Sequence, residues 1–311
     1  MRFMMLLIAL AAAPLARAAF TIDDNGKALT VLDNGQPVLV YHYTLVPPPK
    51  NVPEKFRRAC YIHPLYGLDG EVMTQDFPLD HFHHRGVFWA WPLCTVGDKP
   101  MDVWALDGVR QMHEKWLARE AGETAEVAVQ NVWVYDDAPD QPQVRETIRM
   151  VIHPADQQSR AIDFDMKFEN VSQEVVTFLG AANKGYGGLC IRPDAARKPM
   201  TFTTAHGVLK EDALRVDTPW ADVSYPVKPD GPSSGIAIFE HPSVPGYPFP
   251  GWIMRHYSFL GVSWPHEASH ALQPGESFTL RYRMLVHRGG ADDAKVAEAF
   301  HAYTQENTPK P

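Results

Sequence analysis

The sequence has little cysteine and no recognisable cysteine motif. Cys60, Cys94 and Cys190 are the only cysteines among 311 residues, and an odd number cannot pair completely. No two of them form a CxxC motif, so a disulfide scaffold is excluded and a cysteine metal site is disfavoured. Buried thiols that pack as small hydrophobic side chains are the favoured interpretation, and one disulfide among the three stays open.

Basic residues are also fewer than acidic ones. The chain has 29 Lys and Arg against 37 Asp and Glu, a net charge of −8, and no long run of either sign. Binding to a phosphate backbone needs a basic surface, so no nucleic-acid partner is expected. The serine-hydrolase elbow (GxSxG) and the zinc-binding helix (HExxH) are absent as well, which argues against those two enzyme classes.

Long hydrophobic runs are confined to the N-terminus. Arg2 is followed by an apolar stretch over residues 3–13 and by Ala16-Arg17-Ala18, the pattern of a cleaved secretory signal. The stretch is too short to span a bilayer comfortably, so an uncleaved anchor is the weaker alternative. We predict a signal peptide over residues 1–18 and a mature chain that is periplasmic or secreted in a bacterium. No later run can cross a membrane, so no membrane partner is expected after signal removal.

Helical periodicity is nearly absent, and short apolar runs between turn-forming residues take its place. Asn34-Gly35 between two apolar runs predicts a β-hairpin. Residues 161–170 and 278–287 alternate between apolar and polar positions, as half-buried antiparallel strands do. The other strands expected cover residues 29–32, 37–43, 126–135, 144–153, 175–179, 200–204 and 235–240.

One segment with helical spacing lies near the C-terminus. Asp292 and Asp293 suit the start of a helix, and Val296, Phe300 and Tyr303 form an apolar stripe. No flexible linker, change of composition or fixed-period repeat divides the rest of the chain. The predicted fold is therefore all-β: a large antiparallel β-sandwich over residues 19–311, forming a single domain with a short C-terminal helix.

The densest cluster of polar and aromatic residues lies at residues 76–91. Asp80, His81, His83, His84 and Arg85 fall within six positions there. A histidine beside an arginine and a carboxylate can act as a general acid or base, so these five are the catalytic candidates. If the run is extended, His81, His83 and Arg85 share one face, with Asp80 and His84 on the other. A surface histidine cluster or a hydrogen-bonded corner is the alternative.

The His81-Phe82-His83 pattern also allows a metal site. Two imidazoles two positions apart on a strand can bind one ion, as in jelly-roll enzymes of the cupin type. The acidic ligand expected shortly afterwards is missing. No cofactor is firmly implied, and a divalent transition metal on His81 and His83 stays an alternative.

Aromatic residues beside the cluster are candidates for substrate binding. Trp89 and Trp91 share strand parity with His81, so they can form a stacking platform for a sugar, unless they belong to the core. Glu114 is a candidate carboxylate partner for a histidine, with a solvated surface role as the alternative.

Two later segments can contribute to the same site. The glycine cluster of residues 183–192 predicts a bulged strand that a ligand can approach closely. It carries Lys184, Tyr186 and Arg192, and either cation can face a carboxylate or a hydroxyl group. Residues 252–257, with Arg255, and residues 264–266 can line the same cleft. Purely structural roles are compatible with both segments.

In these segments the sequence resembles a family of exported bacterial proteins that carry the name methane oxygenase PmoA or are described as a domain of unknown function. The resemblance rests on residues 61–65 (YIHPL), 80–86 (DHFHHRG), 88–91 (FWAW), 185–189 (GYGGL) and 274–283 (PGESFTLRYR), in order along nearly the whole chain. Family members usually have proline between the first two histidines, where Phe82 stands here. Particulate methane monooxygenase is a membrane protein, so the name is not taken as an activity.

The resemblance implies a β-supersandwich similar to galactose mutarotase-like and polysaccharide-active enzymes, with a carbohydrate or small-molecule substrate. An analogy of fold does not establish function. The leading hypothesis is an exported enzyme that acts on a sugar by histidine acid/base chemistry, as an epimerase, a lyase or a glycosidase. A non-catalytic glycan-binding protein and a metal-dependent jelly-roll enzyme are the alternatives.

Overall fold

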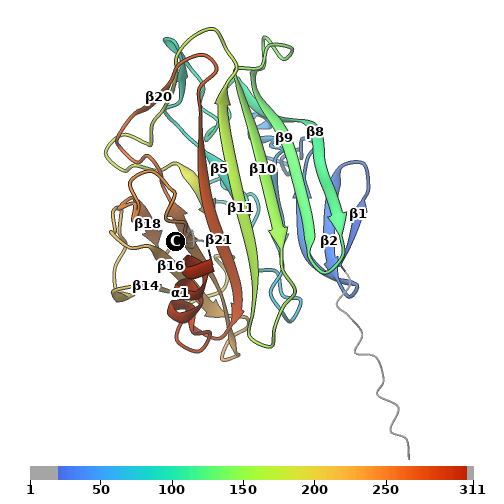
Figure 1. Cartoon of the computed structure of the whole chain (residues 1–311), viewed down its shortest axis with the longest axis vertical. Coiled ribbons are helices and arrows are strands. Elements are labelled where there is room, and N and C mark those ends of the chain that lie inside the picture. The colour runs from blue at the N-terminus through green and yellow to red at the C-terminus, as the bar shows by residue number, and fades with distance from the viewer. Residues whose placement is uncertain (1–19, 307–311) are drawn as a thin grey trace, which may run out of the picture.

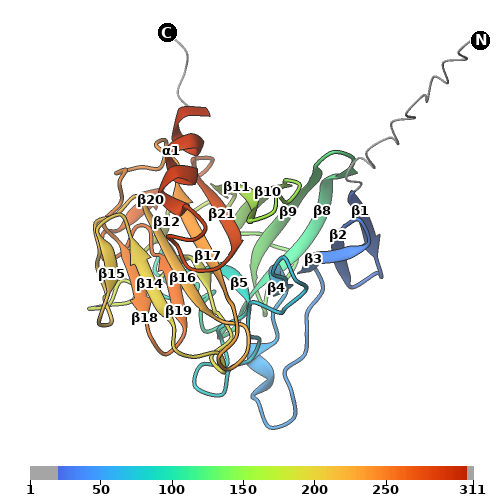
Figure 2. The same cartoon turned by 90° about the horizontal axis from the view of Figure 1, so that it is seen from below.

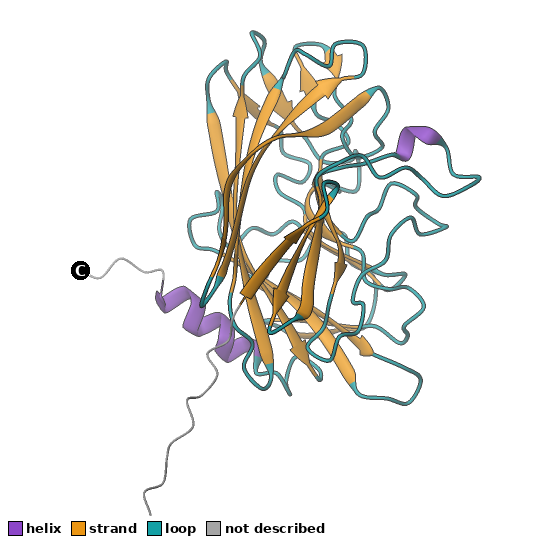
Figure 3. Ribbon diagram, turned by 90° about the vertical axis from the view of Figure 1, so that its right-hand side faces the viewer, coloured by secondary structure: helices purple, strands orange, loops and turns teal. Residues whose placement is uncertain are grey.

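The computed structural model describes residues 20–306, and strands dominate within them (Figure 1). Two large antiparallel sheets lie face to face (Figure 3). This confirms the prediction of an all-β antiparallel sandwich. The predicted signal peptide, residues 1–18, lies outside the described residues.

The first large sheet has eight strands and begins with the predicted hairpin. Asn34 and Gly35 both have positive φ, at 49° and 78°, as a type I′ turn requires. In sheet order the strands are β1 (Phe20–Asp24), β2 (Ala28–Asp33), β3 (Gln36–His42), β4 (Tyr61–Leu65), β5 (Val87–Ala90), β13 (Gly188–Ile191), β19 (Phe259–Val262) and β18 (Trp252–Arg255).

The second large sheet has nine strands. Phe164 and Met166 lie opposite Tyr282 and Leu280 on the neighbouring strand, and all four side chains are buried, which confirms the predicted alternation of residues 161–170 and 278–287. In sheet order the strands are β15 (Gly207–Leu209), β14 (Thr201–Thr204), β16 (Trp220–Pro226), β17 (Ser233–Glu240), β21 (Ser277–Arg288), β11 (Ser159–Asn170), β10 (Val144–Ile152), β9 (Ala125–Tyr135) and β8 (Val109–Ala121).

The remaining elements are short. A third sheet contains, in order, β20 (His270–Leu272), β12 (Val176–Phe178), β6 (Thr95–Val96) and β7 (Lys99–Pro100). A single 3₁₀ turn, η1 (Glu54–Phe56), lies in the long loop between β3 and β4. Figure 3 shows this loop on the outer side of the eight-stranded sheet. No helix within residues 20–306 has the length and hydropathy needed to span a bilayer.

The predicted C-terminal helix packs on the outer face of the nine-stranded sheet (Figures 2 and 3). It is α1 (Val296–Glu306). Its stripe of Val296, Phe300 and Tyr303 is buried against Trp220 and Phe239. The helix therefore covers apolar side chains on the side of this sheet that faces away from the sandwich core.

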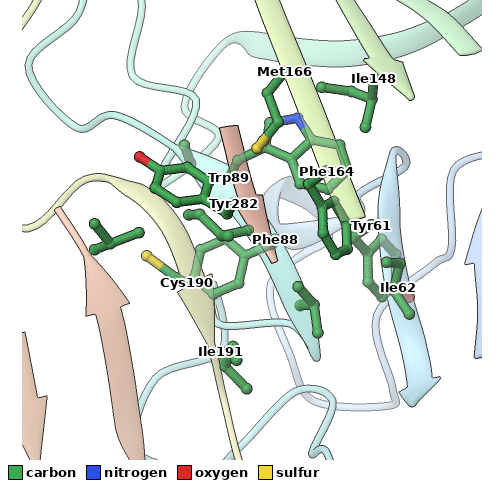
Figure 4. Packing of buried hydrophobic residues seen from close by; sticks show 14 of the residues in the cluster. Tyr61, Ile62, Phe88, Trp89, Ile148, Phe164, Met166, Cys190, Ile191 and Tyr282 are labelled. Carbon is green, nitrogen blue, oxygen red and sulfur yellow. The ribbon is translucent and has the colours of Figure 1, made fainter. Parts of the chain in front are cut away.

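The space between the two large sheets holds the main hydrophobic core (Figure 4). One buried carboxylate, Glu146 on β10, interrupts it. Glu146 accepts hydrogen bonds from Trp89 Nε1 at 3.0 Å, Trp133 Nε1 at 2.6 Å and Asn131 Nδ2 at 2.7 Å. Burial raises the pKa of Glu146, and these donors act to lower it. The indole of Trp89 is thereby fixed inside the sandwich.

Candidate functional site

Residues 76–86 form turns, so the extended conformation considered for the histidine segment is wrong. The backbone N–H of His81 donates to Pro78 O at 3.0 Å, and that of His84 donates to His81 O at 2.9 Å. Asp76 and Arg85 pair across the base of this loop, and the strand β5 begins only at Val87. Because turns reverse the chain within a few residues, the alternation of faces expected for a strand does not apply.

The turns bring three imidazoles together. The rings of His81 and His84 are stacked, with centroids 4.7 Å apart and planes at 5°. The ring of His83 stands edge-on to that of His84 at 4.6 Å. Tyr257 stacks on the other side of His81 at 5.1 Å. Trp104 lies edge-on to His84 at 5.5 Å.

These rings line a pocket of about 460 Å³, here called the imidazole pocket. It lies on the outer side of the eight-stranded sheet. Trp89 points from β5 into the sandwich, so its neighbour Phe88 faces outward, and Phe88 contacts both His84 and Trp104. The residues that line the pocket are His81, His83, His84, Pro92, Trp104, Ala181, Lys184, Tyr186, Arg255 and Tyr257.

Arg192 fixes the proton on His84. Its Nη1 lies 3.3 Å from His84 Nδ1. A guanidinium group can only donate, so Nδ1 of His84 must accept, and the ring proton is on Nε2. Arg192 is itself held by Asp80, whose Oδ1 and Oδ2 accept from Arg192 Nη2 at 2.7 and 2.9 Å.

Asp80 favours the other position of the ring proton on His81, namely Nδ1. Its Oδ2 lies 3.0 Å from His81 Nδ1, an ion-pair distance without the geometry of a hydrogen bond, so Asp80 acts on this ring through its charge. Although burial acts to raise it, the hydrogen bonds from Arg192, together with the nearby His81 ring, lower the pKa of the Asp80 carboxyl. The resulting carboxylate favours a proton on Nδ1 of His81 and leaves the lone pair on Nε2. The two stacked rings therefore have complementary proton positions.

Two of the three imidazoles are neutral near physiological pH. Burial lowers the pKa of His83 to about 3, and the neighbouring His81, Arg58 and Arg192 add to the effect. Burial, then His83 and His81, holds the pKa of His84 well below its ordinary value. Desolvation and nearby positive charge both oppose protonation. His84 is almost completely buried, whereas about a third of the His81 side chain is exposed.

A buried arginine stands behind the pocket wall. Arg58 Nη2 donates to Val103 O at 2.6 Å and to Trp104 O at 3.1 Å, and Nη1 donates to Gln111 Oε1 at 2.9 Å. These are neutral acceptors. Burial lowers the pKa of Arg58 to about 9, so the group stays charged at neutral pH. Arg58 thus holds the backbone of Trp104 in place and leaves a positive charge close to the imidazoles.

The glycine cluster brings Lys184 and Tyr186 to the imidazole pocket, where their predicted role in substrate binding stays a prediction. Gly185 has a φ of +78°, and a Cβ atom there would lie 2.1 Å from His266 Nε2, so only glycine allows this close approach. Lys184 is exposed at the rim. Arg255 donates to the hydroxyl of Tyr186 at 3.1 Å and to Asp212 Oδ2 at 2.8 Å. Residues 252–257 therefore do reach this cleft.

Arg85 does not face the imidazole pocket, so its predicted role there is wrong. It is fully buried and pairs with Asp76. Its Nη2 donates to Asp76 Oδ2 at 3.0 Å and contacts the hydroxyl of Tyr61. Its guanidinium lies over the rings of Phe77, at 3.6 Å, and Tyr61, at 4.2 Å. Arg85 therefore closes the base of the histidine loop.

Trp89 and Trp91 are core residues, and the stacking platform predicted for them is wrong. Both are fully buried. Trp89 Nε1 donates to Glu146, and Trp91 Nε1 donates to Trp264 O at 2.8 Å. The histidine segment is not continuous with strand β5 in one extended run, so Trp89 and Trp91 do not share a face with His81.

Glu114 and Arg192 also differ from their predicted roles. Glu114 lies on β8, where it accepts from Gln130 and lies 3.8 Å from Arg145, so it is no partner of the histidines. Arg192 is buried and does not line the pocket. It acts on the site through His84 and Asp80.

Sequence reasoning gave no site role to Trp104, Pro92 or Ala181, which all line the pocket. Trp104 was one of eight tryptophans, and nothing local distinguishes it from a core residue. No group of three or more His, Cys, Asp or Glu side chains within residues 20–306 is arranged to hold a metal ion. The three cysteines are buried free thiols.

Comparisons with solved structures find matches at low identity. An alpha-galactosidase from Lactobacillus brevis is 13% identical with a TM-score of 0.43, covering 87% of this chain and 38% of that one. The galactosidase domain of the alpha-galactosidase-sucrose kinase AgaSK is 11% identical with a TM-score of 0.44, covering 87% and 42%. A heparan sulfate lyase HepC mutant from Pedobacter heparinus is 11% identical with a TM-score of 0.37, covering 88% and 36%. The chain thus spans about two fifths of the length of these proteins.

Sequence comparisons identify the family of the chain. No curated protein sequence matches it. Residues 28–301 match a family that is described as "Family of unknown function (DUF6807)", a description that names no activity and does not include methane oxygenase. Because the match extends over most of the chain, this protein belongs to the DUF6807 family.

Proposed function

We propose that this protein is an enzyme that acts on a sugar or glycan by acid/base chemistry in the imidazole pocket. The observation that carries the proposal is the stacked pair of His81 and His84, whose centroids lie 4.7 Å apart. Asp80 favours a lone pair on Nε2 of His81, and Arg192 requires a proton on Nε2 of His84. One ring can therefore accept a proton while the other donates a hydrogen bond.

This arrangement suits epimerisation or β-elimination. In either reaction a base removes a proton from a sugar carbon, and the electron pair moves toward an oxygen atom that needs a hydrogen-bond donor. Nε2 of His81 is the base in this scheme, and Nε2–H of His84 is the donor. Asp80 and Arg192 act through the two imidazoles by fixing their protons.

Glycoside hydrolysis is less well supported. It normally uses two carboxyl groups on either side of the scissile bond. None of the described residues that line the imidazole pocket is Asp or Glu. Asp80 and Asp212, which contact lining residues, are engaged by Arg192 and Arg255.

The aromatic walls support a sugar as the substrate. Tyr257, Tyr186 and Trp104 present ring surface to the pocket beside the polar imidazoles. A sugar has apolar C–H faces that pack on aromatic rings and hydroxyl groups that need hydrogen-bond partners. We further propose that the protein is exported, on the strength of the signal-like pattern of residues 1–18.

Turnover of a panel of neutral and acidic sugars and their oligomers tests the proposal. The variants are His81→Asn and His84→Asn, with His301→Asn on the exposed side of α1 as the matched control. We expect either pocket variant to lose turnover by about a hundredfold or more, while sugar affinity, measured by calorimetry, changes only severalfold. The control variant should behave as the wild type.

A non-catalytic glycan-binding protein is the second candidate. The lack of a lining carboxylate among the described residues favours it. The same experiment separates the two functions. Binding of a sugar without turnover by the wild-type protein, and loss of that binding in the pocket variants, would establish the binding protein and exclude the enzyme.

A further inference from the structure

The imidazole pocket has a charge imbalance. Two acidic side chains beside it are engaged by arginines: Asp80 by Arg192, and Asp212 by Arg255 at 2.8 Å. A third, Asp102, accepts the backbone N–H groups of Trp104 and Ala105. Asp212 also accepts from His256 Nδ1 at 2.9 Å. These contacts neutralise the two arginines without leaving an acidic group for a ligand.

Two further cations form no salt bridge among the described residues. The half-buried Asp102 lies close enough to Arg58 to raise the pKa of that guanidinium, but burial raises the pKa of the Asp102 carboxyl itself and so opposes its negative charge. Arg58 forms hydrogen bonds only to Gln111 and to the backbone oxygens of Val103 and Trp104, and its Nε has no partner among the described residues. Lys184 is exposed at the rim and forms no ion pair within residues 20–306. The surroundings of the pocket therefore carry a surplus of positive charge, which favours a negatively charged ligand.

The neutral imidazoles fit the same conclusion. Positive charge from Arg58 and Arg192 contributes to the low pKa of both His83 and His84. An anion bound between these groups would offset that charge and raise both values. Burial and these charges thus keep His83 and His84 neutral, and a bound anion would make protonation of these two rings easier.

We infer that the sugar taken by the imidazole pocket carries an anionic group, a carboxylate or a sulfate ester, which Lys184 and Arg255 bind. This inference rests on the proposed function and adds its substrate class. Lys184 supplies an unpaired ammonium group, and Arg255 supplies guanidinium N–H groups beyond those bonded to Asp212 and Tyr186. Aromatic rings of Tyr257 and Trp104 contact the sugar ring.

The chemistry of the proposed reaction agrees with this substrate class. When a proton leaves the carbon beside a carboxylate, its electron pair adds negative charge to a group that is already charged. Cations at that group lower the barrier by offsetting the added charge. The proton goes to Nε2 of His81. In an elimination the same electron pair forms the C=C bond as the bond to the leaving oxygen breaks, and the leaving oxygen takes the proton that His81 has accepted. In an epimerisation a proton from water returns to the opposite face of the carbon, and His81 releases the proton that it took to water.

Calorimetric titration with four ligands tests the inference: D-galacturonate, D-glucuronate, D-galactose 6-sulfate and neutral D-galactose. We expect at least one anionic sugar to bind about tenfold or more tightly than the neutral sugar, since only the anionic sugar offers a charge that complements Lys184 and Arg255. The expected affinity also falls as salt is added. Binding of the uronates alone would identify a carboxylate, and equal binding of the sulfate ester would identify a general oxyanion site.

Lys184→Ala provides the residue test, with the exposed Lys115→Ala on β8 as the matched control. We expect Lys184→Ala to weaken binding of the anionic sugar about fivefold more than it weakens binding of the neutral sugar. Arg255→Lys, which keeps the charge, should lose less affinity than Arg255→Gln. Equal effects of Lys184→Ala and Lys115→Ala on the anionic sugar would overturn the inference.

The failure of this inference can be told from failure of the proposed function. If neutral sugars bind or react at the pocket as well as acidic ones, the sugar site stands and the anionic group is excluded. If no sugar of either kind binds, the proposed function fails and the inference fails with it.

Discussion

Glu240, at the end of β17, should make the stability of the protein fall as the pH rises. The side chain is fully buried. Its Oε2 accepts the backbone N–H of Phe249 at 2.8 Å, while its Oε1 has no partner among the described residues. Burial raises the pKa of this carboxyl to about 8, well above its ordinary value of 4.5, and the Phe249 bond offsets only part of the effect. Replacing Glu240 by Gln removes the charge and keeps an acceptor for Phe249.

The sign and size of the effect follow from the two pKa values. Between 4.5 and about 8 the folded protein holds a proton on Glu240 that the unfolded chain has lost. The contribution of Glu240 to the free energy of unfolding is therefore fully present below pH 4.5 and falls as the pH rises from 4.5 to about 8. Above about pH 8 it no longer changes. The change between pH 5 and pH 9 amounts to about 4 kcal/mol. Glu240→Gln should be within about 1 kcal/mol of the wild type at pH 5 and clearly more stable at pH 9.

Urea unfolding of both proteins at pH 5, 7 and 9 measures this difference. Other titrating groups, including the pocket histidines, contribute equally to both proteins, so they cancel in the difference. Glu298→Gln, at an exposed position on α1, is the control and should show no pH-dependent difference. A stability gap between Glu240→Gln and the wild type that stays constant from pH 5 to pH 9 would refute the reasoning.

Three further predictions follow from the site and the core. The ring of His83, with its pKa near 3, should show no NMR titration between pH 8 and pH 5. Because this pKa lies below 6.5 in the folded protein, His83 should lower the free energy of unfolding as the pH falls from 6.5 toward 3. An NMR titration midpoint near 6.5 would contradict this. Trp89→Phe removes a donor to buried Glu146 and should lower the free energy of unfolding by about 2 kcal/mol in denaturant titrations, whereas a change below about 0.5 kcal/mol would show that the bond is not needed. Mass spectrometry of protein purified without chelator should find no stoichiometric transition metal, since the described residues offer no group of three ligands; near-stoichiometric metal that is lost in His81→Ala would show a metal site instead.

Much of the fold could be predicted because long strands with one face in the core carry a visible pattern. Residues 161–170 alternate along β11, and Asn34-Gly35 has the backbone preferences of its turn. Short strands buried on both faces could not be predicted in this way. All four residues of β5, and all four of β13, are buried, so neither strand shows an alternation to detect.

The composition of the site could be predicted only in part, since its chemistry depends on contacts between distant segments. The spacing of His81, His83 and His84 drew attention to this loop, but the turns that bring the three rings together are closed by hydrogen bonds that the spacing does not predict. Asp80 and Arg192 are 112 positions apart in the chain and meet at 2.7 Å. No local pattern encodes such a pairing, and it is this pairing that assigns opposite proton positions to the two stacked imidazoles.

The residues of the histidine motif have two different roles that the sequence does not distinguish: some hold the loop closed, and others line the pocket. Arg85 and Asp76 form a buried pair at the base of the loop, enclosed by the rings of Phe77 and Tyr61. Breaking one half of such a buried pair is strongly destabilising, so loss of activity in an Arg85 variant would not identify it as a group that touches substrate. His81 is partly exposed, and asparagine in place of His84 keeps an oxygen that can accept from the buried Arg192, so these two substitutions leave no buried charge unpaired. Variants of these two are accordingly the informative ones for function, and variants of Arg85 report on whether the loop that presents them is formed.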